Sequence, residues 1–418
     1  MKKLNCQTIY EALGRESVHP FPARMAPGIA LQIIAGSKKP LRILDPMMGS
    51  GTVIALARSK GHKAFGVDID PLAVLISRAW TTTANSKKVQ IKAREVLVRA
   101  RKIFAALSEG QAYPKGADEE TRRFVSFWFD GYARRQLTAL SLAIKGVRDQ
   151  NVRDVLLCAL SRLIITKQSG ASLAKDLSHS RPHKSFKRAP AKPFRKFLKV
   201  VERISKNCVQ NNQKGKGPIP RLYLGDARAL PVADGTIDLV LTSPPYLNAI
   251  DYIRCSKFSL VWMGYRIPAL RLLRAESVGA DLGDATSSTD LEVSAIIDGL
   301  KVRSQLSNRA CAALAHYIDD MRNAMRETAR VLVPGGTAVY VIGENTVRGT
   351  FIRNSKIVSA VAQLCGLKLK KQQTRALPAN RRYLPPPSQE KSSAPLDTRM
   401  RREVILKFRK PRPRKPKN

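Results

Sequence analysis

The run Thr242–Tyr246, with the sequence Thr-Ser-Pro-Pro-Tyr, has the most specific chemical character in the chain. It follows the apolar run 237–241, which is typical of a buried strand. A Pro-Pro step can neither continue a sheet nor freely start a helix, so we expect a stiff, extended loop whose proline carbonyls are free to accept hydrogen bonds. Acceptors beside an aromatic ring suit a planar base with an exocyclic amino group. The alternative is a proline-capped strand end with a buried tyrosine.

A second candidate site is the glycine-containing run 45–52, Asp-Pro-Met-Met-Gly-Ser-Gly-Thr, which follows the apolar run 41–44 and precedes a predicted helix. Gly49 and Gly51 allow a tight turn and a close approach of a ligand to the backbone. A phosphate-binding P-loop requires a lysine before the Ser/Thr, and none is present. A dinucleotide-binding fingerprint requires a third small residue where Ile54 stands.

An acidic residue ends the next predicted strand, 64–67. Asp68 lies 17 residues after Gly51, and an acid roughly 20 residues beyond such a loop accepts hydrogen bonds from a ribose. The alternative is a turn acid at the end of a strand. Asp70 precedes Pro71, a pattern typical of a helix N-cap.

Three segments together resemble the amino-group DNA methyltransferases. The run Thr242–Tyr246 is similar to their catalytic motif, and its Ser-Pro-Pro-Tyr form is more typical of N(4)-cytosine enzymes than of the Asp-Pro-Pro-Tyr N(6)-adenine enzymes. The run 44–52 resembles their S-adenosylmethionine loop, which needs only the strand, the acid, the two glycines and the helix. The turn Gly225-Asp226-Ala227 resembles the acidic turn that holds the cofactor's adenine. The resemblance covers about two thirds of the chain and is weakest between Trp80 and Arg221.

This resemblance implies an α/β, Rossmann-like class I methyltransferase fold, with a mostly parallel seven-stranded sheet and a helical, basic insertion. It implies S-adenosylmethionine as the cofactor, whose ribose carries no phosphate, so that no phosphate-binding lysine is required. The residues implied to bind it are Phe21, Asp45, Pro46, Gly49, Ser50, Gly51, Thr52, Asp68, Ile69, Asp226 and Ala227. Phe21 would pack against the methionine part, although the proline-rich segment around it also suits the start of a helix.

The implied reaction is direct methyl transfer to the exocyclic nitrogen of a base that is flipped out of the duplex. The implied catalytic residues are Ser243, Pro244, Pro245 and Tyr246. Tyr246 would stack on the base, while the Ser243 hydroxyl and the Pro244 carbonyl accept the amino protons. C(5)-cytosine chemistry needs a cysteine, typically after proline, and none of the six cysteines follows one. A zinc deaminase needs His-x-Glu and a cysteine pair, which are both missing, and we expect no metal.

Composition favours a nucleic-acid partner. The 418 residues carry a formal net charge of +42, which indicates binding to a polyanion; DNA is the first candidate and an anionic membrane surface a weaker one. The sequence contains no apolar run of eighteen residues and no signal peptide. The scattered cysteines favour a reduced, cytoplasmic protein without structural zinc.

Strand patterns stop between 84 and 220. We therefore predict a discontinuous catalytic domain (1–83 and 221–408), an insertion (84–220) that is a candidate DNA-recognition region, and a flexible basic tail (409–418). Helices are expected over 90–107, 132–147 and 152–166. The basic residues predicted to bind nucleic acid are Arg181, Lys184, Lys187, Arg188, Lys192, Arg195, Lys196, Arg412, Arg414 and Lys415.

Within the insertion, the run 169–199 has no apolar period. Its aromatic residues Phe186, Phe194 and Phe197 stand between the basic ones, and such an arrangement can stack unpaired bases while the cations pair with phosphates. A solvated linker is the alternative.

Strand patterns resume at 221–224, 237–241 and 338–342, with a final antiparallel pair at 368–375 and 403–407. A tight turn is expected at 334–336, and helices at 317–332 and 355–365. The polar stretch 264–310 shows no strand pattern; it fits either a second target-recognition loop or partial disorder.

Taken together, the sequence predicts an N(4)-cytosine DNA methyltransferase of a restriction-modification or defence system, with a cognate restriction endonuclease as a candidate partner. One alternative is an enzyme of the same fold that acts on adenine or on RNA. Another is a non-catalytic nucleic-acid-binding protein on a decayed scaffold, against which the intact Asp45, Gly49, Gly51, Asp68 and Tyr246 argue.

Overall fold

The computed structural model forms two compact units. The first comprises Met1–Pro40, Met48–Leu224 and Tyr252–Arg274, and the second comprises Leu41–Met47, Gly225–Asp251 and Ala275–Asn418. The structure describes residues 7–22, 24–37, 39–167, 169–175, 177, 182–209, 217–247, 251–280, 290–347, 349–376 and 402–413. The predicted domain boundaries stay a prediction.

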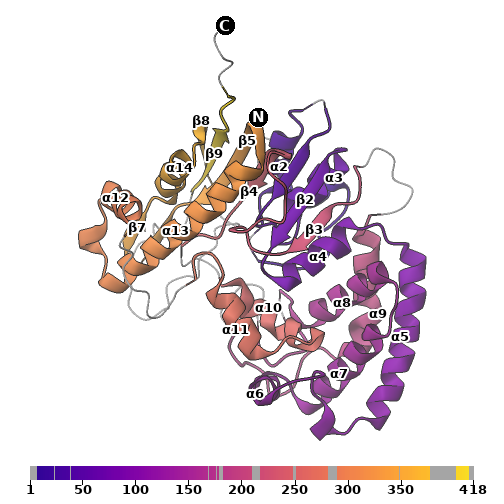
Figure 1. The fold of residues 1–418 in the computed structure, drawn as a ribbon. Coiled ribbons are helices and arrows are strands. Elements are labelled where there is room, and N and C mark those ends of the chain that lie inside the picture. The colour runs from indigo at the N-terminus through magenta and orange to yellow at the C-terminus, as the bar shows by residue number, and fades with distance from the viewer. Residues whose placement is uncertain are drawn as a thin grey trace. The chain divides into compact units, whose positions relative to one another are not determined.

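The strands are β1 (Arg42–Asp45), β2 (Lys63–Asp68), β3 (Arg221–Leu224), β4 (Ile237–Thr242), β5 (Leu332–Gly343), β8 (Lys368–Ala376) and β9 (Arg402–Arg409), in the sheet order β3-β2-β1-β4-β5-β9-β8 (Figure 1). The pairs β1–β4, β4–β5 and β2–β3 are parallel, whereas β9 is antiparallel to β5 and β8. The predicted α/β fold with a mostly parallel seven-stranded sheet is confirmed. A separate hairpin pairs β6 (Asn345–Val347) with β7 (Thr350–Ile352).

The first unit is mainly helical. Its helices are α1 (Ile9–Leu13), α2 (Pro27–Ile34), α3 (Thr52–Ser59), α4 (Pro71–Thr81), α5 (Ser86–Ala106), η2 (Glu109–Gln111), α6 (Glu119–Trp128), α7 (Gly131–Lys145), α8 (Gln150–Ile164), α9 (Pro193–Asn207), α10 (Tyr252–Leu260), η3 (Val261–Met263) and α11 (Ile267–Ala275). The predicted helices of the insertion are present as α5, α7 and α8. Each begins one to four residues earlier than predicted, because Asn85, Asp130 and Asp149 accept backbone hydrogen bonds as N-caps.

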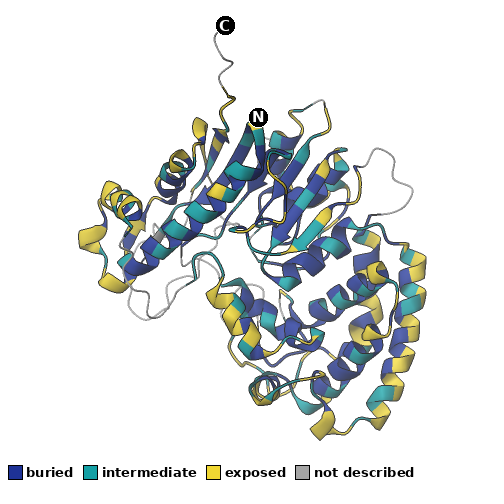
Figure 2. Ribbon diagram, in the orientation of Figure 1, coloured by how far each residue is buried: buried dark blue, intermediate teal, exposed yellow. Residues whose placement is uncertain are grey.

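Helix α9 corrects the expectation of irregular structure up to residue 199. It begins at Pro193, a favourable first helical position. Its apolar residues Phe197, Val201 and Ile204 recur at helical spacing and are buried, but the many lysines between them conceal this period in the sequence. Figure 2 shows the same division in α5, which has one buried and one exposed face.

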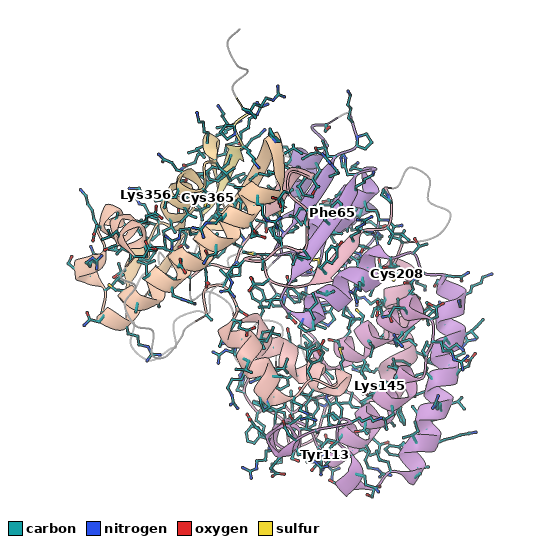
Figure 3. The ribbon with its side chains drawn as sticks, in the orientation of Figure 1. Phe65, Tyr113, Lys145, Cys208, Lys356 and Cys365 are labelled. Atoms are coloured by element: carbon teal, nitrogen blue, oxygen red, sulfur yellow. The ribbon has the colours of Figure 1, made fainter. Side chains whose placement is uncertain are left out.

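The second unit carries α12 (Leu291–Leu300), η4 (Arg303–Gln305), α13 (Asn308–Val331) and α14 (Asn354–Leu364). Helix α13 begins nine residues before its predicted start, because Ser307 caps it by accepting from the Ala310 amide at 3.3 Å. Helices α13 and α14 pack side by side (Figure 1). Cys365, labelled in Figure 3, closes α14 with its Sγ 3.6 Å from the Arg322 carbonyl oxygen of α13.

The turn expected at 334–336 lies inside β5 and not before it. Leu332 already pairs with Ile237, and the register then jumps to the pair Leu239 and Thr337. Gly335 has a positive φ of 79°, so the intervening residues bulge out of the ladder. Helix α12 likewise shows that part of the stretch 264–310 is regular. Among the described residues, no helix is long and apolar enough to cross a membrane.

Candidate functional site

In the first unit, the glycine loop is closed by its own backbone. The Gly51 amide donates to the Met48 carbonyl at 2.9 Å, and the Met48 amide donates to the Val67 carbonyl of β2 at 3.0 Å. Gly49 and Gly51 have φ values of 50° and 80°, in the left-handed region that favours glycine. A Cβ on Gly51 would lie 2.5 Å from the Ser77 hydroxyl oxygen. The loop conformation therefore requires glycine at this position.

The carboxylate of Asp68 holds this loop against the end of β2. One oxygen accepts from the Gly49 amide at 2.7 Å, and the other accepts from the Asp70 amide at 2.9 Å. Asp70 caps α4 as predicted; burial raises its pKa to about 6, and it accepts from Ser256 at 2.5 Å.

The glycine loop also holds a buried hydroxyl. Ser50 is 4% exposed, and no described residue lies in hydrogen-bonding range of its Oγ. Because an unpartnered buried hydroxyl is costly, this atom marks a place where a polar ligand group would improve the structure. The neighbouring Thr52 begins α3 and is buried, while Ile69 is half-buried.

An aromatic pair lies next to the same loop. Phe21 stacks on Tyr252 with ring centroids 5.7 Å apart and planes inclined by 11°. A Cβ on Gly49 would stand 3.4 Å from the ring of Phe21. Phe21 therefore does lie against the glycine loop. Sequence reasoning missed Tyr252 and Ser77 as parts of this arrangement; the only signal was an aromatic residue shortly after the Ser-Pro-Pro-Tyr run.

In the second unit, Asp45 is buried at the end of β1. Its Oδ1 accepts from the Thr242 hydroxyl at 2.7 Å and from the Met47 amide at 3.2 Å. Burial raises the pKa of this carboxyl to about 7. Pro46 is buried beside it. Asp45 thus ties the end of β1 to the last residue of β4, immediately before the Ser-Pro-Pro-Tyr loop.

That loop holds its two hydroxyls close together. The oxygens of Ser243 and Tyr246 are 3.4 Å apart, and burial is the main factor that raises the pKa of the Tyr246 phenol. Pro244 is buried, whereas the other three residues are half-buried. The Pro245 carbonyl accepts a hydrogen bond, as expected, but from the phenol of Tyr317 at 3.2 Å; that the proline carbonyls accept from a base stays a prediction.

Two asparagines fasten the end of the loop. Asn345 donates to the Leu247 carbonyl and accepts from the Asn354 amide at 2.8 Å. Asn354 is fully buried and also donates to the Gly343 carbonyl. Sequence reasoning missed Tyr317, Asn345 and Asn354, because each is distant in sequence from the loop that it supports.

The acidic turn after β3 is engaged in an ion pair. The Asp226 carboxylate accepts from the Arg228 guanidinium at 2.6 Å and from the Arg228 amide at 2.8 Å. Arg228 also pairs with Asp320, which is 2% exposed. Ala227 is buried. A polar pocket of about 440 Å³ adjoins this pair and is lined by Arg228, His316, Asp319, Asp320, Asn323, Arg326 and Glu327.

The predicted nucleic-acid residues that the structure describes are all exposed: Lys184, Lys187, Arg188, Lys192, Arg195, Lys196 and Arg412. Arg181, Arg414 and Lys415 lie outside the described residues. The stacking role expected for two phenylalanines is wrong. Phe197 is fully buried, and Phe194 is half-buried with its ring packed edge-on against Phe104 at 5.5 Å, because both belong to the inward face of α9.

Two curated proteins are similar to the chain over most of its length. The type II methyltransferase M.MvaI of Kocuria varians is 24% identical over 375 residues, which cover 82% of this chain and 79% of that protein. The type II methyltransferase M.BsoBI of Geobacillus stearothermophilus is 20% identical over 428 residues, which cover 86% and 80%. No protein-family model matches the chain.

The chain also matches solved structures of SAM-dependent methyltransferases, at low sequence identity. A SAM-dependent methyltransferase of Methanosarcina mazei is 8% identical, with a TM-score of 0.34, over 91% of this chain and 98% of its own. A TehB-like SAM-dependent methyltransferase of Corynebacterium glutamicum is 11% identical, with a TM-score of 0.30, over 91% and 86%. The sheet order β3-β2-β1-β4-β5-β9-β8, parallel except for β9, is that of a Rossmann-like methyltransferase fold, and the chain is similar in sequence to two type II methyltransferases.

Proposed function

We propose that this protein is a DNA methyltransferase that transfers a methyl group from S-adenosylmethionine to N4 of a flipped cytosine. The observation that carries the proposal is the Ser-Pro-Pro-Tyr loop at the end of β4, where the Ser243 and Tyr246 oxygens are 3.4 Å apart and Tyr317 holds the Pro245 carbonyl. The similarity to two type II methyltransferases supports DNA as the substrate. The serine, where N(6)-adenine enzymes typically have aspartate, favours cytosine.

The residues of the glycine loop fit a nucleoside cofactor. Asp68 would accept from the ribose hydroxyls through the same carboxylate that binds the Gly49 and Asp70 amides. The orphaned Ser50 hydroxyl can donate to a polar group of the ligand, and Phe21 offers an apolar wall to its aliphatic part. Asp226 would accept a hydrogen bond from the adenine amino group. Because Arg228 already donates to this carboxylate, the adenine contact requires a lone pair that Arg228 does not use.

Bound S-adenosylmethionine would supply an electrophilic methyl group to the cytosine N4, with S-adenosylhomocysteine as the leaving group and the displaced N4 proton passing to solvent. The protein's contribution is orientation. Tyr246 stacks on the base, which limits its rotation. The Ser243 hydroxyl and the Pro244 carbonyl accept from the amino group and direct its lone pair. Such positioning supplies a large part of the acceleration in reactions of this type.

The proposal includes a biological setting. A methyltransferase of this kind works on DNA in the cytoplasm and protects sites from a restriction endonuclease of the same specificity. The basic residues 184–196 of the insertion and the tail beyond 409 would contact phosphates, because they are dense in lysine and arginine and the described ones, apart from the half-buried Lys410, are exposed.

Mass spectrometry of nucleosides tests the proposal. DNA and RNA are incubated separately with the protein and S-adenosylmethionine, and then digested. N4-methylcytosine in the DNA sample is the expected product. N6-methyladenine, or methylation in the RNA sample alone, would establish one of the same-fold alternatives. No product from either polymer, together with binding of nucleic acid, would identify a non-catalytic binding protein.

A further inference from the structure

Strands β8 and β9 carry four basic side chains on one face. Lys371 lies opposite Lys407, and Lys368 lies opposite Arg409, with a shift in register at Lys370 between the two pairs. Opposed residues of an antiparallel pair point to the same face, and so do Lys407 and Arg409, which are two residues apart. All four are exposed. We call these four residues the basic sheet face.

The other face of β9 is part of the core. Val404, Leu406 and Phe408 are at most 5% exposed, and the Phe408 ring lies 6.3 Å from that of Tyr340. Helix α14 packs against β8 and β9 (Figure 1). The alternating pattern of β9 therefore favours polar residues at the exposed positions of its opposite face, where the half-buried Ile405 also lies. It does not require that they be cations.

The observed arrangement is unfavourable for the isolated protein. Directly opposed residues have Cβ atoms about 4.5–5.5 Å apart, and like charges at that separation destabilise a sheet. An acid does lie on this face, but Glu403 stands opposite Arg375 and pairs with it at 3.8 Å, four residues along β9 from Lys407. Among the residues that the structure describes, no acidic side chain forms an ion pair with either of these two like-charged pairs.

Protection of the sheet edge explains only half of this face. Lysines on an edge strand discourage pairing with another sheet, and β8 is an edge strand. Lys407 and Arg409, however, lie on β9, which is bonded to β5 on one side and to β8 on the other. Edge protection does not account for cations on an inner strand.

We propose that the basic sheet face binds the phosphate backbone of duplex DNA, as a contact additional to the insertion and the tail. A polyanion removes the repulsion between the opposed cations, and the release of its counterions drives binding. The contact involves no base edges and is independent of sequence. The inference rests on the proposed function in one respect, the identity of the polyanion as DNA.

Salt dependence of DNA binding tests this inference. The full chain and the double variant K371Q/K407Q are titrated with a duplex oligonucleotide, without cofactor, over a series of salt concentrations. The slope of log affinity against log salt should decrease by about 0.9 for each phosphate that the variant no longer neutralises. The matched control is K60Q/K63Q, which removes two exposed lysines at the start of β2, Lys60 just before it and Lys63 as its first residue, and should leave the slope unchanged. Equal slopes for K371Q/K407Q and the parent would overturn the inference.

A charge reversal separates binding from folding. K371E creates an opposite-charge pair with Lys407, so its melting temperature should equal or exceed that of the parent, while its salt slope decreases. A stable K371E with the parent's slope would refute the DNA contact. The DNA contact would also be refuted if K371E changed the salt slope only with single-stranded RNA or with anionic vesicles and not with duplex DNA. The salt titration does not measure methyl transfer. If the protein proves inactive in the nucleoside assay but K371E still lowers the salt slope, the proposed function is contradicted and this inference stands.

Discussion

The phenol of Tyr317 donates a hydrogen bond across 3.2 Å to the main-chain oxygen of Pro245. Tyr317 lies on α13 and is fully buried, so the proposed catalytic loop is held by a side chain that is 72 residues distant in sequence. One turn further along α13, Asp320 binds Arg228, the partner of Asp226. The same helix therefore supports both the loop after β4 and the acidic turn after β3.

Tyr317→Phe should lower kcat and leave the cofactor Kd unchanged. The change removes one hydrogen bond, worth about 0.5–1.5 kcal/mol, and frees the Pro245 peptide to rotate, but it keeps the packed ring. Steady-state kinetics and cofactor calorimetry check the prediction. Tyr340→Phe is the matched control, because its phenol bonds Thr328 at 2.8 Å in the core. If both variants lose activity in proportion to their loss of melting temperature, Tyr317 only stabilises the fold.

Ser243→Ala and Tyr246→Ala should lose methyl transfer and retain cofactor binding. Ser243 orients the amino group during transfer, so its loss should reduce kcat more than DNA affinity. Tyr246 holds the extrahelical base, and base–aromatic stacking is worth about 1–3 kcal/mol, so both base capture and turnover should decrease. Melting curves are compared with product formation. A Tyr246→Ala variant that melts far below the parent, together with a fully active Ser243→Ala, contradicts the catalytic roles.

Ser50→Ala should weaken cofactor binding without lowering the melting temperature. The Ser50 hydroxyl has no partner among the described residues, so its removal costs the free protein little, whereas the complex loses about 0.5–1.5 kcal/mol. Asp68→Ala should weaken cofactor binding and also lower the melting temperature, since its carboxylate holds the Gly49 and Asp70 amides. The charge-assisted contact of this carboxylate with the ribose is worth about 1.5–3 kcal/mol. Calorimetry and thermal melting check the pair, and unchanged affinity in both variants argues against a ribose contact here.

Gly51→Ala should destabilise the protein more than Gly61→Ala. Both glycines have φ near 80°, so the backbone strain of an added Cβ is the same. Only at Gly51 does the new Cβ meet an obstacle, the Ser77 hydroxyl at 2.5 Å, whereas nothing lies within 4 Å at Gly61. The difference in unfolding free energy isolates the clash, which typically costs about 1–3 kcal/mol. Equal losses in chemical denaturation would show that the loop relaxes around the methyl group.

Asp45→Asn should remove part of the pH dependence of stability. Burial raises the pKa of Asp45 to about 7 in the folded protein, whereas a carboxyl in the unfolded chain titrates near 4. Between these values the folded state binds more protons, so the contribution of Asp45 to stability is fully present below pH 4 and declines as pH rises to 7. The unfolding free energy of the parent should therefore fall relative to that of Asp45→Asn as pH rises from 4 to 7. Parallel curves would mean that Asp45 is ionised in the fold.

Local residue patterns were sufficient to predict the individual strands and the two loops, whereas the seven-stranded sheet was expected from the family resemblance. Strands such as β3 and β4 are short apolar runs that end in glycine, proline or an acid, and these residues impose their turns whatever surrounds them. The positive φ at Gly49 and Gly51 and the N-cap at Asp70 follow from the same local rules. Helix starts were predicted too late, because the capping residues Asn85, Asp130, Asp149 and Ser307 and the first helical turns were assigned to the preceding loops.

Only the tertiary structure decided which side chains meet. The bond from Tyr317 to Pro245, the bridge of Arg228 between Asp226 and Asp320, and the burial of Phe197 join segments that are far apart in sequence or depend on which helix face turns inward. No local pattern encodes such pairings, because a buried hydrogen bond is set by the packing of whole elements and not by the neighbours of either residue. The opposition of Lys371 and Lys407 is of the same kind: each lysine is an ordinary exposed residue in the sequence, and only the register of β8 against β9 brings their charges together.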